Sequence, residues 1–575
     1  MLGRQENQPG LAELYLWSGK NKPLVDEGSF YDRFAKLRPS LLRDEDFIHW
    51  YVEGKGRPSV PPAVVAGAFL LALRDNCSDR EAEQRMRYDL RWKWALDLGL
   101  DDAGCDHSSL CVFRARLLAH EEEDQLFKGL LEKAIAAGLL PKRTLQVLDS
   151  SPLLGAAAVE DTYKLLRRAL HLVVKAHEKK LPKELKERLK RYRTAAKPKL
   201  DWSDPAARKV ELSRLVEDAE AALAGLPEEG EWESVGRARQ LLQQVARQDV
   251  EADADGGLQI RQEVAKDRVV STVDPQMRHG RKSSAGLWNG YKKHLSEEPE
   301  TELITAVAVT PANQPDGPVA IELLEQQAEA GLVPAEVVAD QAYAGSELRA
   351  KALELGEGTT ILTKASVLPE TGYFPKSDFE IDCKQGTVRC PAGQLAYFKH
   401  QPGKRTKATF SQRVCGSCPL LSRCTPARRG RREIHIEAYE EQLHAARQRR
   451  LQPDFALLFS KRPTVERKQA HWNRKGGRKS RYIGQRKTRL QAFWSAALVN
   501  LERLMVLGTD LSPKPSSPEH PGTQVLPSTA TIGINFKSLM WAATSRWRLV
   551  ATHIHVPSCS PSVAVGPTAT FSTAF

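Results

Sequence analysis

Hydrophobic residues recur at helical spacing over residues 41–140. Segments such as "PPAVVAGAFLLALRD" and "SDREAEQRMRYDLRWKWAL" place apolar residues three and four positions apart. Pro61–Pro62 and Ser78–Asp79 are typical of helix starts, because proline suits a first turn and serine can cap exposed amides. The pattern predicts a compact all-helical domain over residues 41–140. Residues 1–40 mix glycine, proline and charge, and they predict an irregular segment.

Beyond residue 140, strand patterns alternate with helical ones. The stretch "TLQVLD" predicts a strand, as do "WNGYKKHLSEE" and "ETELITAVAVTPAN", which the turn "SEEPET" joins into a hairpin. The order continues through "GPVAIELLEQQAEAG", "AEVVADQAY", "SELRAKALELG" and "TTILTKA" as helix, strand, helix and strand. This order predicts a mixed α/β domain with a central sheet over residues 141–507. Two insertions interrupt it: a polar helical stretch at about 160–268, expected to project from the core, and a cysteine-rich stretch at about 368–455.

The periodicity ends near residue 507. Residues 508–575 are rich in Ser, Thr, Pro and Gly, so we expect a disordered or loosely attached tail. Read-through past the natural end of a coding region would produce such a sequence. No stretch approaches the ~20 apolar residues of a membrane span, and the N-terminus lacks a signal pattern. The sequence therefore predicts a cytoplasmic protein without a membrane partner.

The chain carries an excess of positive charge. Its formal net charge is +13 and its pI about 9.2, which favours a polyanionic partner. Phe459–Arg489 contains 12 Lys or Arg and a single acid, Glu466, and we interpret this run as phosphate contact. The run Lys164–Leu200, with 14 Lys or Arg against three Glu, is explained as well by a solvated helix face.

Five of the nine cysteines lie in the stretch 368–455. An odd count in a chain without a secretion signal argues against a disulfide framework. "CPAGQ" and "CGSCPLLSRC" supply four thiols that could hold a structural Zn²⁺, namely Cys390, Cys415, Cys418 and Cys424. The spacing around Cys390 and between Cys418 and Cys424 is irregular for such a site. A structural zinc site and plain thiols in a loop-rich knob both remain open.

Two apolar runs far apart in the chain each end on an aspartate, "LQVLDSS" on Asp149 and "VVADQAY" on Asp340. Either aspartate alone would be more typical of a cap or a turn. Together they suggest one Mg²⁺ site, because Mg²⁺ is bound through one or two carboxylates plus phosphates. Pro463 can begin a helix that carries Glu466, a third carboxylate. We predict Asp149, Asp340 and Glu466 as catalytic residues holding two Mg²⁺ ions, for which Mn²⁺ could substitute.

These motifs together resemble bacterial insertion-sequence transposases with an Asp-Asp-Glu triad. The resemblance covers about residues 20–505 and rests on "LDSSPLLGAAAVEDT", "DPQMRHGRKSSAGLWNGYKKHL", "ITAVAVTPANQPDG", "VVADQAYAGSE" and "RPTVERKQAHWNRKGGRKSRYIG". The helical N-terminal region and the "CPAG" and "CGSCPLLSRCT" segments are similar to parts of the same subgroup. The resemblance implies a ribonuclease-H-like fold in which Asp149 and Asp340 are the triad aspartates and Glu466 is the triad glutamate.

The resemblance also implies a Tyr-Arg-Glu-Lys signature on the Glu466 helix. Arg462 matches its arginine, but Phe459 stands at the tyrosine position and Asn473 at the lysine position. A neighbouring basic residue of "NRKGG" could substitute for the lysine. Basic side chains around this helix are expected to contact DNA phosphates: Arg462, Lys468, Arg474, Lys475, Arg478 and Lys487.

Several other residues are weaker candidates for functional roles or are expected to be structural. Asp161 and Asp274 fall in motifs that resemble the family and are supporting candidates. His294 is expected to be a strand-face histidine rather than a base. Aromatic residues expected to pack between helices, rather than to stack on bases, are Tyr88, Trp92 and Trp94.

The implied function is transposition. The protein would bind the terminal inverted repeats of an insertion sequence and target DNA, hydrolyse a phosphodiester at the element's end, and transfer the freed 3′-hydroxyl to the target. A homodimer or larger synaptic complex, associated with a bacterial nucleoid, would be the working form, with no small-molecule substrate. The alternatives are a catalytically inactive transposase-derived DNA-binding protein and a structural or regulatory zinc protein.

Overall fold

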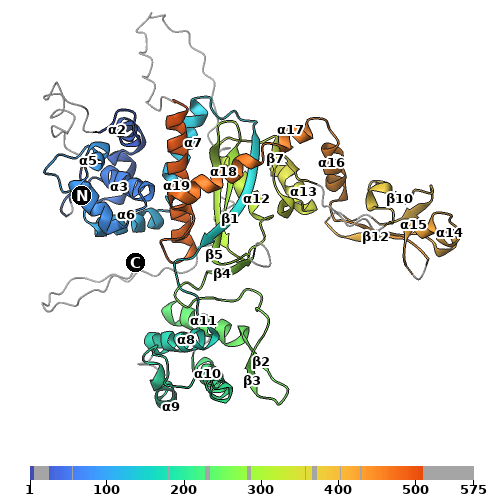
Figure 1. Ribbon diagram of the computed structural model, residues 1–575, viewed down its shortest axis with the longest axis horizontal. Coiled ribbons are helices and arrows are strands. Elements are labelled where there is room, and N and C mark those ends of the chain that lie inside the picture. Colours follow the sequence, from blue (N-terminus) through green and yellow to red (C-terminus); the bar gives the residue numbers. More distant parts are fainter. Residues whose placement is uncertain are drawn as a thin grey trace, which may run out of the picture. The chain divides into compact units, whose positions relative to one another are not determined.

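The computed structural model describes residues 1–4, 25–52, 54, 56–177, 181–226, 233–281, 286–355, 358–364, 372–399, 401, 403–427 and 430–508 (Figure 1). The expected tail over 508–575 therefore lies outside the described residues except for its first residue. Among the described residues, no helix is both long and apolar enough to cross a membrane.

Every described element before residue 145 is a helix. Ser78 caps its helix together with Glu81, and Pro62 stands in the first turn of another, so both predicted helix starts are confirmed. The irregular segment expected over 1–40 is wrong for its last part. There, Ser29 caps a helix by accepting from an amide, and Pro39 lies inside that helix. The helices are α2 (Phe30–Leu41), η1 (Asp44–Trp50), α3 (Pro62–Arg74), α4 (Asp79–Tyr88), α5 (Leu90–Leu96), α6 (His107–Ala119) and α7 (Gln125–Ala136).

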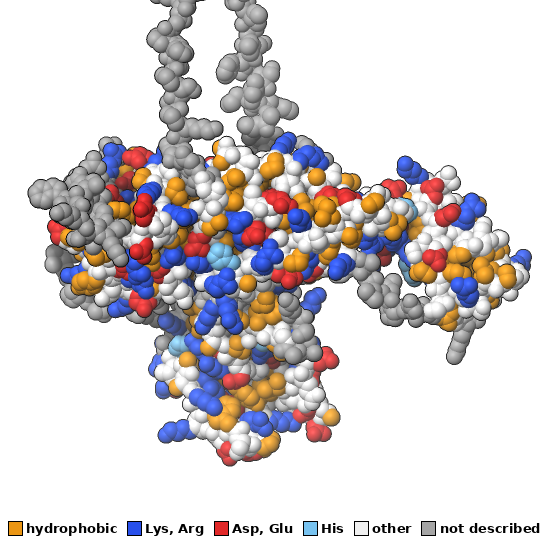
Figure 2. Space-filling model, turned by 45° about the horizontal axis from the view of Figure 1, so that its top comes forward, with side chains coloured by type: hydrophobic (Ala, Val, Ile, Leu, Met, Phe, Trp, Pro, Cys, Tyr) orange, Lys and Arg blue, Asp and Glu red, His pale blue; other side chains and the backbone are white. Residues whose placement is uncertain are grey.

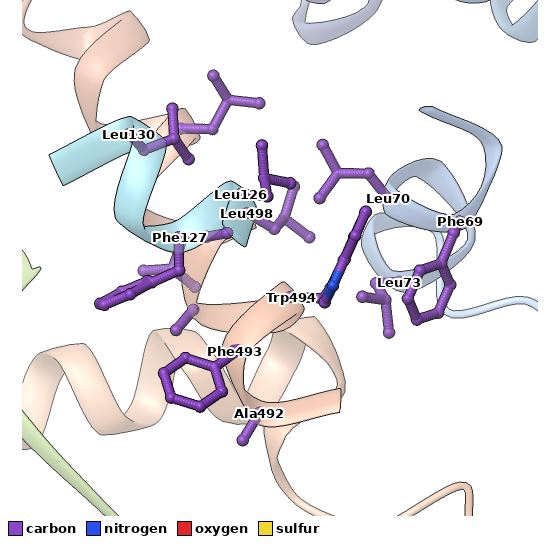
Figure 3. Close-up of a cluster of buried hydrophobic side chains, with 14 of the residues drawn as sticks. Phe69, Leu70, Leu73, Leu126, Phe127, Leu130, Ala492, Phe493, Trp494 and Leu498 are labelled. Atoms are coloured by element: carbon purple, nitrogen blue, oxygen red, sulfur yellow. The ribbon is translucent and has the colours of Figure 1, made fainter. Parts of the chain in front are cut away.

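These helices share a hydrophobic core with the last helix, α19 (Gln485–Val506). The rings of Phe69 in α3 and Trp494 in α19 lie 4.8 Å apart, and those of Phe127 in α7 and Phe493 lie 5.7 Å apart. Figure 3 shows leucines of all three helices filling the space around these rings. The helical N-terminal region is thus packed directly onto the helix that closes the described chain.

The central sheet has the strand order β6-β5-β1-β7-β8, and β4 pairs with the other end of β5. β1, β7 and β8 are parallel, whereas β5 is antiparallel to both β1 and β6. The predicted hairpin and the alternating order that follows it are confirmed. The strands are β1 (Leu145–Leu154), β4 (Arg278–Arg281), β5 (Leu287–Glu298), β6 (Leu303–Pro311), β7 (Glu336–Val338) and β8 (Thr360–Leu362).

Helices cover both faces of the sheet (Figure 1). Successive residues of a strand point to opposite faces. Leu148 accordingly packs with α12 (Val319–Glu329) and α13 (Ser346–Leu355) on one face. Val147 packs on the other face in the core that includes α18 (Pro463–Trp472) and α19. Asp149 is on the same side as Val147, so the sheet directs it toward α18.

The polar insertion at about 160–268 is helical, as predicted, and has its own small core around Leu166, Leu215 and Leu242. Arg167 and Glu211 form a buried ion pair of 2.9 Å within it. Its short hairpin has strands of three residues, too short for the sequence pattern to predict. The elements are α8 (Thr162–His177), α9 (Lys183–Arg188), η3 (Leu189–Tyr192), α10 (Pro205–Gly225), α11 (Glu233–Gln248), β2 (Val250–Ala252) and β3 (Leu258–Ile260).

The cysteine-rich insertion folds into short strands and turns around a core that includes Val388 and Ile434. Near the end of the stretch expected as this insertion, α16 (Glu440–Arg450) returns to the sheet. There, Arg449 pairs with Glu336 of β7 at 2.6 Å. The insertion's elements are η5 (Lys376–Asp378), β9 (Glu380–Asp382), β10 (Thr387–Arg389), β11 (Leu395–Tyr397), β12 (Thr406–Thr409), α14 (Gln412–Gly416), α15 (Leu421–Cys424) and β13 (Glu433–Ile436).

Candidate active site

Asp149 and Asp340 stand level with each other on neighbouring parallel strands. Val147 of β1 is paired with Val338 of β7, and each aspartate follows two residues later. The expectation that both aspartates end a strand is wrong for Asp149, because β1 continues through Leu154 by pairing with β5. β7 does end at Val338, two residues before Asp340. Adjacent strands lie about 4.8 Å apart, so this register places the two carboxylates near one another.

Glu466 approaches from α18, which Pro463 begins as predicted. Arg462, just before the helix, donates from Nη1 to Glu466 Oε1 at 2.6 Å and from Nη2 to Asp149 Oδ1 at 3.4 Å. One guanidinium thus joins the first and third predicted triad carboxylates. The Glu466 side chain is 59% exposed and that of Asp149 15% exposed, so this site opens to solvent on the α18 side.

Asp340 caps the short helix η4 (Gln341–Tyr343) by accepting from the Ala342 amide at 2.9 Å. Tyr343 is fully buried, and burial is the main reason that the pKa of its hydroxyl lies well above the usual value. Nearby carboxylates raise this pKa further: those of Asp316, Asp149 and Asp340. Tyr343 therefore marks the point where both predicted triad aspartates come together, and its hydroxyl remains protonated there.

Asp316 is a further acidic residue beside the site that the sequence did not indicate. It accepts from the Ser150 hydroxyl at 2.7 Å and pairs with Lys292 at 2.5 Å. Ser150 follows Asp149 in β1, so these contacts fix the strand next to the aspartate. Tyr343 stands in "VVADQAY" and Asp316 in "ITAVAVTPANQPDG", but the sequence alone does not show that these segments meet beside "LDSS".

The three carboxylates have the chemistry of a metal site. Three carboxylates provide the hard oxygen donors that Mg²⁺ prefers. Arg462 already places a positive group between Asp149 and Glu466, which indicates that this position favours a cation. Within the described ranges, no group of three or more His, Cys, Asp or Glu side chains has metal-binding spacing. The residues fit the ion by chemistry, and side-chain movement would be needed to close around it.

The basic residues around α18 do not share one environment. Arg474 and Arg478 are exposed, as phosphate contacts require. Lys468 is 3% exposed and pairs with Glu302 at 3.6 Å, so the expected DNA contact by Lys468 is wrong: its amine points into the protein, where burial lowers its pKa. Lys475 pairs with the half-buried Glu502 at 2.6 Å. Lys487 is partly exposed and belongs to α19. Figure 2 shows Lys and Arg intermingled with Asp and Glu over the visible face.

A buried lysine lies where the helix lacks its signature lysine. Lys293 of β5 donates from Nζ to Asn473 Oδ1 at 2.8 Å and lies 4.3 Å from the centre of the Trp472 ring. The side chain is fully buried, and burial lowers its pKa to about 7. Beyond Asn473, the chain turns back to the sheet, where Leu154 donates its amide to the Arg478 carbonyl at 3.0 Å. The basic segment after α18 thus runs beside the end of β1.

The supporting candidates have structural contacts. Asp274 is buried and accepts from the Tyr291 hydroxyl at 2.8 Å and the Gly484 amide at 3.0 Å. Asp161 accepts from the Lys164 amide at 2.9 Å, at the start of α8. Neither contacts the three triad carboxylates through a described hydrogen bond.

His294 and the aromatic residues behave largely as predicted. His294 is buried, contacts the Thr310 hydroxyl at 2.9 Å, and has a pKa lowered by burial to about 4, so it is a strand-face histidine. Trp92 is fully buried and donates to Asp75 at 2.8 Å. The expectation of packing is wrong for Tyr88, whose side chain lies 68% exposed at the end of α4, where no helix covers it.

The four cysteines predicted as zinc ligands converge. They line one small cavity of about 30 Å³ beside Phe374 and Phe410: Cys390, Cys415, Cys418 and Cys424. None forms a disulfide. Burial raises the pKa of the Cys424 thiol, and the other three cysteines are close enough to raise it further. The fold therefore gathers side chains that are up to 34 residues apart in the sequence.

Two family models match the chain. Residues 20–116 match a transposase domain (DUF772), and residues 389–505 match a transposase DDE domain. The chain therefore contains two regions similar to transposase domains, the second of them of the DDE type. The second match contains Glu466, Arg462 and the four clustered cysteines, and the first covers most of the N-terminal helices. No curated protein and no solved structure matches the chain.

Proposed function

We propose that this protein is a transposase that cuts DNA at the ends of an insertion sequence and joins the freed end to target DNA, with Asp149, Asp340 and Glu466 as its catalytic carboxylates. One observation carries the proposal. The register of β1 and β7 sets the two aspartates level, and Arg462 joins Asp149 to Glu466. The three residues come from distant segments, so the contacts that support the proposal come from the fold and not from a local motif.

The strand order supports a ribonuclease-H-like domain. Five strands in the order β6-β5-β1-β7-β8, with β5 alone antiparallel to the others, place the first strand at the centre beside the fourth along the chain. The carboxyl ends of parallel strands are where such sheets bind ligands. We infer that the packed N-terminal helices form a DNA-binding region, since a transposase domain matches there.

Each residue would contribute in a different way. The sheet fixes Asp149 and Asp340, while the exposed Glu466 can adjust to DNA. Divalent metal, as two Mg²⁺ ions or Mn²⁺ held by these carboxylates, would supply Lewis-acid chemistry for an in-line displacement at phosphorus. Exposed Arg474 and Arg478 would hold the DNA backbone, and affinity would fall as salt rises. Both ends of an element must be handled together, so we propose that a homodimer or larger complex is the working form.

The experiment is strand cleavage on a labelled duplex that carries the element's end, with Mg²⁺ or with EDTA. Asp149→Ala and Glu466→Ala are compared with the unaltered chain, and each is checked for DNA binding. We expect metal-dependent nicking that leaves a 3′-hydroxyl, lost in both variants although they bind DNA. Tight binding without cleavage in Mg²⁺ or Mn²⁺ would contradict the proposal and favour an inactive DNA-binding protein.

We also propose that the four clustered cysteines hold a structural Zn²⁺. The insertion has short strands and a small core, and folds of this size commonly need a metal or disulfides. The four thiols line one small cavity together with apolar side chains, and they would have to draw together to hold the ion. Metal analysis of the purified chain should find one zinc per chain that Cys415→Ser with Cys418→Ser removes, whereas Cys77→Ser, at a cysteine outside the cluster, should retain it. An unaltered chain without zinc would contradict this.

A further inference from the structure

Arg462 has a contact pattern that a simple surface arginine lacks. Its two terminal nitrogens divide between carboxylates of different elements, Glu466 at 2.6 Å and Asp149 at 3.4 Å. The Arg462 side chain is only 22% exposed. Its Nε is buried and donates to no acceptor within the described residues. The arginine is therefore held by two charged contacts and keeps one donor direction uncommitted.

We propose that Arg462 is a positioning residue that couples metal binding to DNA binding: a divalent cation displaces it from Asp149 and Glu466, and it then holds a DNA phosphate. The proposal rests on the proposed metal site at the three carboxylates. In this proposal, metal binding and DNA binding both depend on the position of the Arg462 side chain.

The first step follows from electrostatics. Asp149 Oδ1 and Glu466 Oε1 each accept from the guanidinium, and a cation bound by the same oxygens would stand close to the positive guanidinium. Like charges at such separation repel by several kcal/mol at the effective dielectric near a protein surface. The two cations therefore compete, and Arg462 lowers the affinity of the carboxylates for metal.

The second step concerns where the arginine goes. A guanidinium presents a planar fork of donors that matches a phosphate in bidentate geometry. Arg462 lies at the solvent-open side of the site, next to the exposed Glu466. A DNA phosphate that arrives at the bound metal would accept the released donors. Because coupling between two binding events is reciprocal, metal should tighten DNA binding by the factor by which DNA tightens metal binding.

The test measures Mn²⁺ affinity by electron paramagnetic resonance on the full chain without DNA. Arg462→Gln should bind Mn²⁺ on the order of tenfold more tightly than the unaltered chain, equivalent to ~1.4 kcal/mol. The matched control is Arg467→Gln, which removes the same charge five residues further along the chain, in α18, from a guanidinium that pairs with Glu302 at 3.4 Å. Its Mn²⁺ affinity should be unchanged. Equal or weaker Mn²⁺ binding by Arg462→Gln would overturn the proposal.

DNA binding gives the second readout. Fluorescence anisotropy with the end duplex should show that Mn²⁺ tightens binding to the unaltered chain and that this gain is smaller in Arg462→Gln, where only the metal's own attraction for the phosphate remains. A gain of equal size in the variant would overturn the coupling. Arg462→Lys keeps the charge without the fork, and it should retain the lower Mn²⁺ affinity while binding DNA more weakly. If circular dichroism shows that Arg462→Gln does not fold, Arg462→Lys tests the proposal in its place.

Failure of the proposed metal site and failure of the coupling through Arg462 give different results. If Asp149→Asn removes no Mn²⁺ binding from the chain, the proposed metal site itself is wrong and the coupling falls with it. If Asp149→Asn removes Mn²⁺ binding but Arg462→Gln does not strengthen it, the metal site stands and only the coupling is wrong. Neither measurement depends on strand cleavage.

Discussion

Replacing Lys293 by methionine should stabilise the protein at pH 6. Methionine has a similar length and no charge, and Lys293 is a fully buried lysine beneath the turn that follows α18. Burial lowers its pKa from 10.5 to about 7, so the folded protein holds the proton much less tightly than the unfolded chain. At pH values below the folded pKa, this difference costs about 5 kcal/mol of stability.

Two contacts reduce the net gain. Without the amine, Asn473 loses its donor, which costs roughly 1–3 kcal/mol for a buried polar group. The cation over the Trp472 ring is worth about 1–2 kcal/mol. These losses sum to roughly 2–5 kcal/mol, so the expected net stabilisation by Lys293→Met is roughly 0–3 kcal/mol at pH 6.

The lowered pKa of Lys293 also determines how the free energy of unfolding changes with pH. Between pH 7 and 10.5, the unfolded chain binds more protons at this lysine than the folded chain, so the free energy of unfolding rises with pH, by at most about 1.4 kcal/mol per unit. Lys293→Met should remove this rise. Lys351→Met, at an exposed lysine of α13, is the matched control.

Thermal unfolding followed by circular dichroism from pH 6 to pH 9.5 would measure these differences. The variant should melt higher than the unaltered chain at pH 6, and this advantage should shrink and then reverse as the pH rises to 9.5. A variant that melts lower at pH 6, or that keeps the pH dependence of the unaltered chain, would refute this account of the buried amine.

Three further predictions follow from single contacts. Asp340→Asn should slow end cleavage by more than the roughly 100-fold that loss of an outer partner costs, with DNA binding by anisotropy unchanged; equal cleavage would contradict its assignment. Glu211→Gln removes the partner of the buried Arg167 and should cost roughly 3–5 kcal/mol, seen as faster hydrogen exchange in α8 and α10; unchanged protection would contradict it. Trp494→Ala should lower the melting temperature through a loss of roughly 3–5 kcal/mol, since its ring packs on Phe69, and an unchanged temperature would show that α3 and α19 pack independently.

Much of the sheet followed from local patterns. A nearly continuous apolar run predicted β6, and the turn before it predicted its pairing with β5. The length of β1 did not follow, because Ser150, Ser151 and Pro152 end the apolar run while the backbone continues to pair with β5. Backbone pairing does not depend on apolar side chains, so Asp149 was expected at a strand end although it lies within the strand.

The sequence predicted the three carboxylates of the site but not the residues that surround them. Asp149, Asp340 and Glu466 were predictable because each differs from its own segment: the two aspartates end apolar runs, and Glu466 is the single acid in a basic run. Lys468 looked like its basic neighbours, but the turn that carries Glu302 covers it. The contacts of Tyr343 and Asp316 likewise depend on segments far apart in the chain. Helical spacing tells which residues share a face, and only the tertiary fold tells what covers that face.

The most direct test of the central claim is to map the metal site by cleavage of the protein itself. Fe²⁺ in place of Mg²⁺, with ascorbate and peroxide, generates hydroxyl radicals that cut the backbone near the bound ion. The account predicts cuts near Asp149, Asp340 and Glu466 in the same preparation, suppressed by excess Mg²⁺ and all lost together in Asp149→Asn. Cuts at one of these segments alone, or cuts that persist in Asp149→Asn, would contradict a single site built from the three carboxylates.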